Sequence, residues 1–139
     1  MNLATTRLRL ASDAGELDMR LTTAAAVFVA ANALHSLDHA RQGLDRLTPE
    51  IVSAGSLLSL GAVLALVLAL RADRRAAPVC VAIGVGTALG VAASHLAPHW
   101  SAFSDPYPEL SLDVLSWVVM LAEIAAALVL AVVGARELP

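Results

Sequence analysis

The sequence is poor in the residues that soluble and nucleic-acid-binding proteins use most. Of its 139 residues only 15% are charged and 4% are aromatic, and every basic residue is arginine. Soluble domains carry about 25% charged residues. The net charge is −3 and no basic cluster is interleaved with aromatic residues, so we expect no nucleic-acid partner. The single cysteine, Cys80, excludes an internal disulfide and a CxxC site.

Common catalytic signatures are missing as well. The chain has no GxSxG nucleophile turn, no phosphate-binding P-loop and no HExxH zinc motif. The stretch "GVGTALG" has a glycine-rich spacing, but no strand precedes it, so it does not predict a dinucleotide site. Small residues at short spacing instead predict close helix packing. These residues are Ser53, Gly55, Ser56, Ser59, Gly86, Gly90 and Ser94.

Long apolar runs are what the sequence has in excess. Hydrophobic residues make up 58% of the chain and the mean hydropathy is +0.75. A helix of ~20 residues crosses a hydrocarbon layer of ~30 Å. The sequence therefore predicts an all-α integral membrane protein, a four-transmembrane-helix bundle over residues 21–139 that follows a cytoplasmic or interfacial tail over residues 1–20. The expected spans are about 21–40, 49–70, 78–97 and 112–135.

Local signals mark where two of these spans start and argue that the first is retained. Thr48 offers an N-cap before Pro49, and the segment Ser111 to Asp113 opens the last span in a similar way. Residues 21–33 resemble the apolar part of a cleavable signal peptide. The preceding tail is long and contains acidic residues, which favours an uncleaved first span.

The arginines predict the orientation in the membrane. Seven of them fall on one side of the four spans and two on the other. Because basic residues concentrate on the cytoplasmic side, both termini and the loop "RADRR" are expected there. The cytoplasmic set is Arg7, Arg9, Arg20, Arg71, Arg74, Arg75 and Arg136, and the outer set is Arg41 and Arg46.

All four histidines fall in two stretches with the same spacing. His35 and His39 lie at the outer end of the first span, and His95 and His99 at the outer end of the third. Residues four apart share a helix face, so His35 and His39 are expected to point at one centre. Pro98 ends or bends the third span, so His99 depends on the loop.

Two histidine pairs with nearby carboxylates predict a transition-metal site of zinc, copper or iron. The expected ligands are the four histidines, with Asp38 and Asp105 as further ligands. Three alternatives remain open: interfacial histidines paired with carboxylates or headgroups, ligation of one haem, and a pH-sensing cluster. The loop "SAFSDPYPELS" is stiffened by two prolines, and either covers the histidines as a lid or is a plain turn.

The fourth span carries a polar stripe of Asp113, Ser116, Met120 and Glu123. Asp113 is expected at the outer mouth and Glu123 roughly 16 Å deeper, near the bilayer centre. A carboxyl group there is costly unless paired, hydrated or protonated. With no charged partner expected within the spans, Glu123 is predicted to be protonated or hydrated and, with Asp113, to serve catalysis. A structural hydrogen bond between helices is the alternative.

These features lead to three functional hypotheses, and they leave open whether the protein is an enzyme. The first is a metal-dependent membrane enzyme that oxidises or hydrolyses a lipophilic substrate. The second is a metal-ion or proton transporter with the histidines as its first site and Glu123 as its midway site. The third is a non-catalytic subunit of a larger membrane complex. The expected partners are the lipid bilayer, a lipophilic substrate or metal ion, and further copies of the chain or other subunits.

Overall fold

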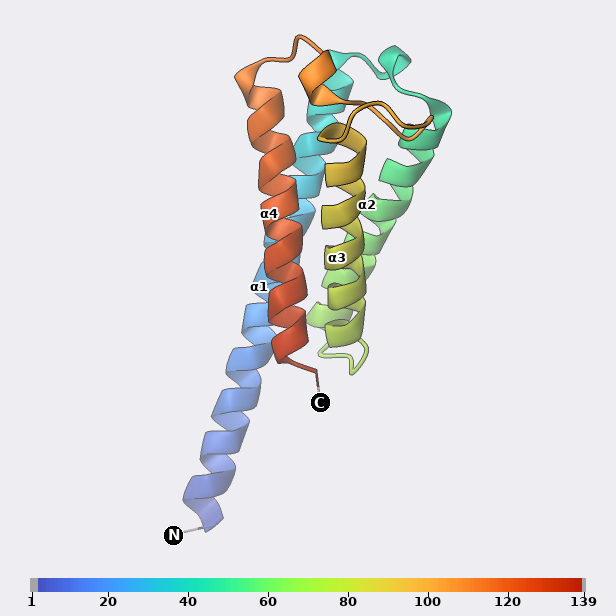
Figure 1. The fold of residues 1–139 in the computed structure, drawn as a ribbon. Helices are drawn as coiled ribbons and strands as arrows, with labels where there is room; N and C mark the ends of the chain where they lie inside the picture. The colour runs from blue at the N-terminus through green and yellow to red at the C-terminus, as the bar shows by residue number, and fades with distance from the viewer. Residues whose placement is uncertain (1–2, 139) are drawn as a thin grey trace.

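The computed structural model describes the backbone of residues 3–138 and the side chains of residues 19–138. The regular secondary structure of this part of the chain is all helical, with short 3-10 turns at Leu44–Arg46 and Tyr107–Glu109. Figure 1 shows the long helices lying side by side, with the connecting loops at their two ends. These helices are α1 (Leu3–Gln42), α2 (Pro49–Leu70), α3 (Ala76–His95) and α4 (Val114–Arg136).

Three of the helices are long and apolar enough to cross a membrane. Their mean hydropathies are 2.3 for α2, 1.9 for α3 and 2.5 for α4. The remaining helix, α1, is not among them, because polar residues such as Asn32, His35 and Asp38 interrupt its apolar part. The crossing of residues 21–40, and the orientation of the termini, therefore remain predictions.

The N-terminal part of α1 extends past the other helices (Figure 1). Its 40 residues correspond to about 60 Å at helical rise, which exceeds the ~30 Å of a hydrocarbon core. The backbone is continuous from Leu3 through the predicted boundary at residue 20. The predicted contact of residues 1–20 with a membrane surface falls mostly on side chains outside the described range.

Side-chain caps begin two of the helices. Thr48 Oγ1 accepts a hydrogen bond of 3.2 Å from the backbone N–H of Ile51 at the start of α2. Asp113 Oδ1 accepts one of 3.0 Å from Ser116 at the start of α4. Each cap satisfies a backbone donor that a helix leaves without an internal partner. The predicted start of α2 at Thr48 and Pro49 is confirmed.

The largest apolar cluster of the helices lies in the half away from the histidines. There Ala25 and Phe28 of α1, Ala65 of α2 and Leu130 of α4 belong to one buried apolar cluster. α3 and α4 approach most closely at Gly84, where an added Cβ would lie 2.5 Å from the carbonyl oxygen of Ala127. Small residues let two helix backbones come this near.

The predicted packing role of the other small residues was wrong in part. An added Cβ at Gly55, Gly86 or Gly90 would meet no atom within 4 Å, so these glycines lie at no helix contact. The close contacts are made by Gly61, Gly84 and Gly134. A four-residue spacing shows which residues share a helix face, but not which face meets a neighbouring helix.

α2 separates from the rest of the structure in its first half. Its buried residues are all in its second half: Ala62, Ala65, Leu68 and Ala69. Figure 1 shows α2 diverging from α3 toward the end that carries the long loop. A cavity of about 800 Å³ lies here, and Gly55 and Gly90 are among the residues that line it.

Candidate metal centre

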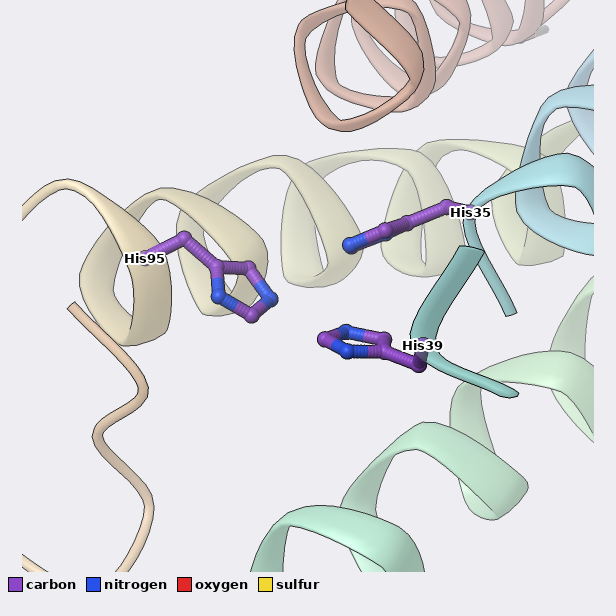
Figure 2. Close-up of side chains that lie close together, drawn as sticks. All are labelled: His35, His39 and His95. Carbon is purple, nitrogen blue, oxygen red and sulfur yellow. The ribbon is translucent and has the colours of Figure 1, made fainter. Parts of the chain in front are cut away.

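Three imidazole rings form a cluster at the loop end of the helices. His35 and His39 come from successive turns of α1, and His95 comes from the last turn of α3. The ring centroids are 4.6 Å apart for His35 and His39, 5.1 Å for His35 and His95, and 5.3 Å for His39 and His95. Figure 2 shows the rings approaching one another across a common gap. One ring nitrogen from each lies within 4.8 Å of the other two.

The His35 ring is held in place by a carboxyl group. Its Nδ1 is hydrogen-bonded to Oε2 of Glu123 on α4. The other oxygen, Oε1, accepts a hydrogen bond of 2.7 Å from Asn32, one turn before His35. The other ring nitrogen, Nε2, lies 3.2 Å from the hydroxyl of Tyr107, and a metal ion bound to Nε2 would replace this contact. Metal-binding histidines commonly use one ring nitrogen for the metal and the other for such a carboxylate or carbonyl.

The His95 ring is held by the backbone of the long loop. Its Nδ1 lies 3.0 Å from the carbonyl oxygen of Asp105. A carbonyl oxygen only accepts, so Nδ1 carries the hydrogen and Nε2 carries the lone pair. The lone pair is the part of a neutral imidazole that binds a metal. His95 is therefore set in the tautomer that a metal site needs.

The third ring, that of His39, has the fewest contacts that fix its orientation. Its Nδ1 is buried and has no hydrogen-bond partner. The nearest carboxylate oxygen, Oδ2 of Asp105, is 4.0 Å from His39 Nδ1 and 3.7 Å from His95 Nδ1. A buried nitrogen without a partner is unfavourable because water no longer solvates it. A bound cation would satisfy this nitrogen, whereas the Asp105 carboxylate lies beside Nδ1 of His95, the nitrogen that already contacts the loop carbonyl.

Glu123 lies beside the histidines, which corrects the expectation that the spans offer it no charged or chargeable partner. Glu123 is 1% exposed, and its carboxyl group is hydrogen-bonded to both His35 and Asn32. His35 lies two helical turns before the end of α1, so it comes deeper than the sequence reading placed it. Antiparallel packing of α1 and α4 then brings the two residues to one level. Glu123 is thus part of the histidine site and not a separate station below it.

Tyr107 is a site residue that the sequence analysis did not identify. It is fully buried in the long loop, and its hydroxyl oxygen lies 3.2 Å from Nε2 of His35. Burial raises the pKa of this phenol, so the hydroxyl keeps its hydrogen. The only signal was indirect: Tyr107 stands between two prolines, which predicted a stiff loop but not the direction of the side chain.

Asp38 and Asp113 do not join the imidazoles, because both are engaged by Arg41. The guanidinium donates to Asp38 at 2.8 Å and to Asp113 at 2.9 Å, which connects α1 to α4. Gln42 donates a further hydrogen bond to Asp38. Hydrogen bonds from the Ser116 backbone and from Arg41 hold the pKa of Asp113 below its usual value. These two residues belong to a structural cluster at the helix ends.

His99 also lies apart from the other histidines. α3 ends at His95, so the four-residue spacing no longer places His99 on the same helix face. Its side chain is exposed, and its backbone N–H donates to Oε1 of Glu109 at 3.3 Å. The end of the helix ahead of Pro98 explains the difference, since proline disfavours a helical conformation in the residue before it.

The distances between the nitrogens suit a transition metal after a small movement of the side chains. Metal–nitrogen bonds of about 2.0–2.1 Å place two ligand nitrogens of a tetrahedral site about 3.3–3.5 Å apart. The ring nitrogens lie within 4.8 Å of one another, so the rings would have to move closer together to bind one metal ion. Three protein ligands leave a coordination position open, which is typical of catalytic and not of structural zinc sites. The metal itself is not identified by these residues.

Comparisons with known protein families, with curated proteins and with solved structures found no match to this chain. The geometry of the site is therefore the basis for the functional interpretation.

Proposed function

We propose that this protein is a membrane protein with a transition-metal centre formed by His35, His39 and His95. The observation that carries the proposal is that three histidine rings converge on one gap and that hydrogen bonds fix the orientation of two of them. Three buried or half-buried ring nitrogens face one gap, while Glu123 and the Asp105 carbonyl hold the outer nitrogens of two rings. Interfacial histidines need no such second contact, because water and headgroups solvate them. The Asp105 carboxylate lies beside the cluster, 3.7 Å from Nδ1 of His95.

The proposed reaction class is metal-dependent oxidation or hydrolysis of a lipophilic substrate. The centre lies on the wall of the 800 Å³ cavity, which is lined by the three histidines and Glu123 among mainly apolar side chains. A cavity of this size suits a small-molecule ligand. Copper or iron at the site would supply redox chemistry, and zinc would supply an activated water. Glu123 orients His35, and because it also lines the cavity it is placed to exchange a proton with a bound molecule.

Transport through the same site has less support. A pathway would need polar groups beyond Glu123, toward the loop between α2 and α3. Around and beyond Glu123 the described helices form the apolar cluster that contains Phe28, Ala127 and Leu130. Transport would also need Glu123 as a second site along the path, but Glu123 contacts His35 and belongs to the histidine site. The arginine distribution further supports a location at the extracytoplasmic end of the spans, with both termini in the cytoplasm.

Metal analysis of the purified protein tests the proposal. Protein purified without chelators should contain about one transition-metal ion per chain, as expected for a single three-histidine site. His35→Ala and His95→Ala should each remove most of it. His99→Ala is the matched control, because this histidine lies outside the cluster, and it should retain the metal. Wild-type protein without metal, even after supplementation with copper, iron and zinc, would refute the proposed centre.

A further inference from the structure

The cavity beside the histidines has a polar end and an apolar remainder. His35, His39, His95, Asn32 and Glu123 line the polar end. The rest of the wall comes mainly from apolar residues of α2, α3 and the two outer loops, including Leu44, Leu47, Trp100 and Phe103. This division suits a molecule with one polar head and an apolar body. The volume of about 800 Å³ lies within the range of about 300–1,000 Å³ that is usual for small-molecule sites.

The charge of the lining restricts the head group. Among the described residues, no arginine lines the cavity, and Glu123 is the only acidic residue that does. Arg41, the basic residue nearest in sequence to these histidines, is occupied by Asp38 and Asp113. Apart from the proposed metal ion, the lining therefore offers no cation to a carboxylate or phosphate head, and burying an unpaired charge is costly. A neutral oxygen group, as in an alcohol, aldehyde or quinone, finds hydrogen-bonding partners and the open metal position.

The cavity is bordered by residues that would face lipid. Val52, Leu60 and Val63 line it, yet their exposed fractions are 46%, 67% and 51%. They belong to α2, whose first half has no buried residue. α2 and α3 are two of the helices apolar enough to cross a membrane. The opening between them is thus directed toward the bilayer, where a lipid-soluble molecule is concentrated.

From these observations we propose that the cavity binds an uncharged, lipid-soluble molecule with a single oxygen-containing head, which enters from the bilayer between α2 and α3. The head lies at the histidines, and the apolar body lies along α2 and beneath Trp100 and Phe103. This assignment names the substrate class of the proposed enzyme and rests on that function for the role of the head. Binding itself is measured without any assay of a reaction.

Retinol is a suitable probe because it is a neutral alcohol that accepts excitation energy from tryptophan. Trp100 lines the cavity, so bound retinol should quench tryptophan fluorescence in a saturable way in nanodiscs that hold the full chain. Retinoic acid has the same apolar body with a carboxylate head. In protein from which the metal has been removed with a chelator, it should bind about tenfold more weakly than retinol, because the cavity lining offers this charge no arginine. Non-saturable quenching by retinol, or equal or tighter binding of retinoic acid to the metal-free protein, would overturn the proposed ligand class.

Glycine substitutions inside and outside the cavity test whether retinol binds there. Gly90→Leu and Gly55→Leu place a side chain in the cavity, where an added Cβ meets no atom within 4 Å. Each should weaken retinol binding by about tenfold or more through loss of the space. Gly86→Leu is the control, since Gly86 has the same open surroundings but does not line the cavity. It should bind retinol as the wild type does, and equal loss in all three variants would overturn the assignment.

Metal content, measured on the same samples, distinguishes this inference from the proposed function. Metal present with no saturable retinol binding refutes the ligand class and leaves the metal centre standing. Retinol binding that is lost in Gly90→Leu, in protein that holds no metal, supports the cavity and refutes the centre. Unchanged metal in Gly90→Leu also shows that the substitution leaves the histidine site folded.

Discussion

At the scale of single residues, the contact between Glu123 and His35 is the most informative feature of the site. The sequence shows each residue to be unusual in an apolar helix, but α1 and α4 are far apart along the chain. Spacing within one helix predicts that His35 and His39 share a face. It does not predict the depth at which another helix packs, which is why Glu123 was placed below the histidines. Tyr107 was missed for a related reason, because the direction of a loop side chain depends on tertiary contacts.

The contact predicts that Glu123 controls metal affinity without binding the metal. Glu123→Ala removes the group that orients His35, and loss of such an outer partner weakens metal binding by about 10–100-fold. Competition with a chelator of known affinity measures the change. Glu50→Ala is the matched control, because this glutamate is exposed in the first turn of α2. Equal affinity in Glu123→Ala and the wild type would show that the carboxyl group has no part in holding the site.

At the scale of helices, the sequence predicts where a helix starts better than it predicts which helices contact one another. Thr48 caps α2 as expected, because the signal is local: a hydroxyl, a proline and an early carboxylate within three positions. Helix contacts are not local. Among glycines with similar surroundings in the sequence, Gly84 lies against α4 and Gly86 does not. The same limitation explains His99, whose spacing is meaningful only if the helix continues, and α3 ends at His95.

Gly84 and Gly86 therefore provide a matched test of the contact between α3 and α4. Gly84→Leu forces a side chain against the backbone of Ala127, and overpacking of this kind costs about 1–3 kcal/mol. Gly86→Leu meets no atom and should have little effect. Cys80 is the only cysteine and is buried, so its reaction with a thiol dye reports thermal unfolding. The Gly84 variant should react at a temperature lower by several degrees, and coincident curves for the two variants would contradict the contact.

At the scale of the whole molecule, the helical fold follows from composition, whereas the orientation in the membrane rests on the arginines. Three of the four predicted spans coincide with helices that are long and apolar enough to cross a membrane, because the hydrocarbon thickness sets a simple length requirement. The fourth crossing is harder to predict, since α1 carries the polar groups of the site itself. A helix that brings His35, His39 and Asn32 to a buried centre is necessarily less apolar than its neighbours.

Labelling of single cysteines tests the orientation. In a Cys80→Ala background, Ala102→Cys places a thiol in the exposed part of the loop between α3 and α4, and Leu138→Cys places one after α4. A thiol reagent that does not cross membranes should label Ala102→Cys in intact cells and leave Leu138→Cys unlabelled until lysis. The reverse pattern would place the histidine site on the cytoplasmic side. Labelling of both would show that α4 does not cross the membrane.

The continuity of α1 has a consequence for how the protein relates two compartments. One unbroken helix carries His35 and His39 near its C-terminal end and runs back about 50 Å to Leu3. If α1 crosses the bilayer, about half of its length emerges on the face opposite the histidines. In the orientation that the arginines predict, any molecule that binds this projecting segment would meet the protein in the cytosol, and the proposed metal centre would lie on the far side of the membrane.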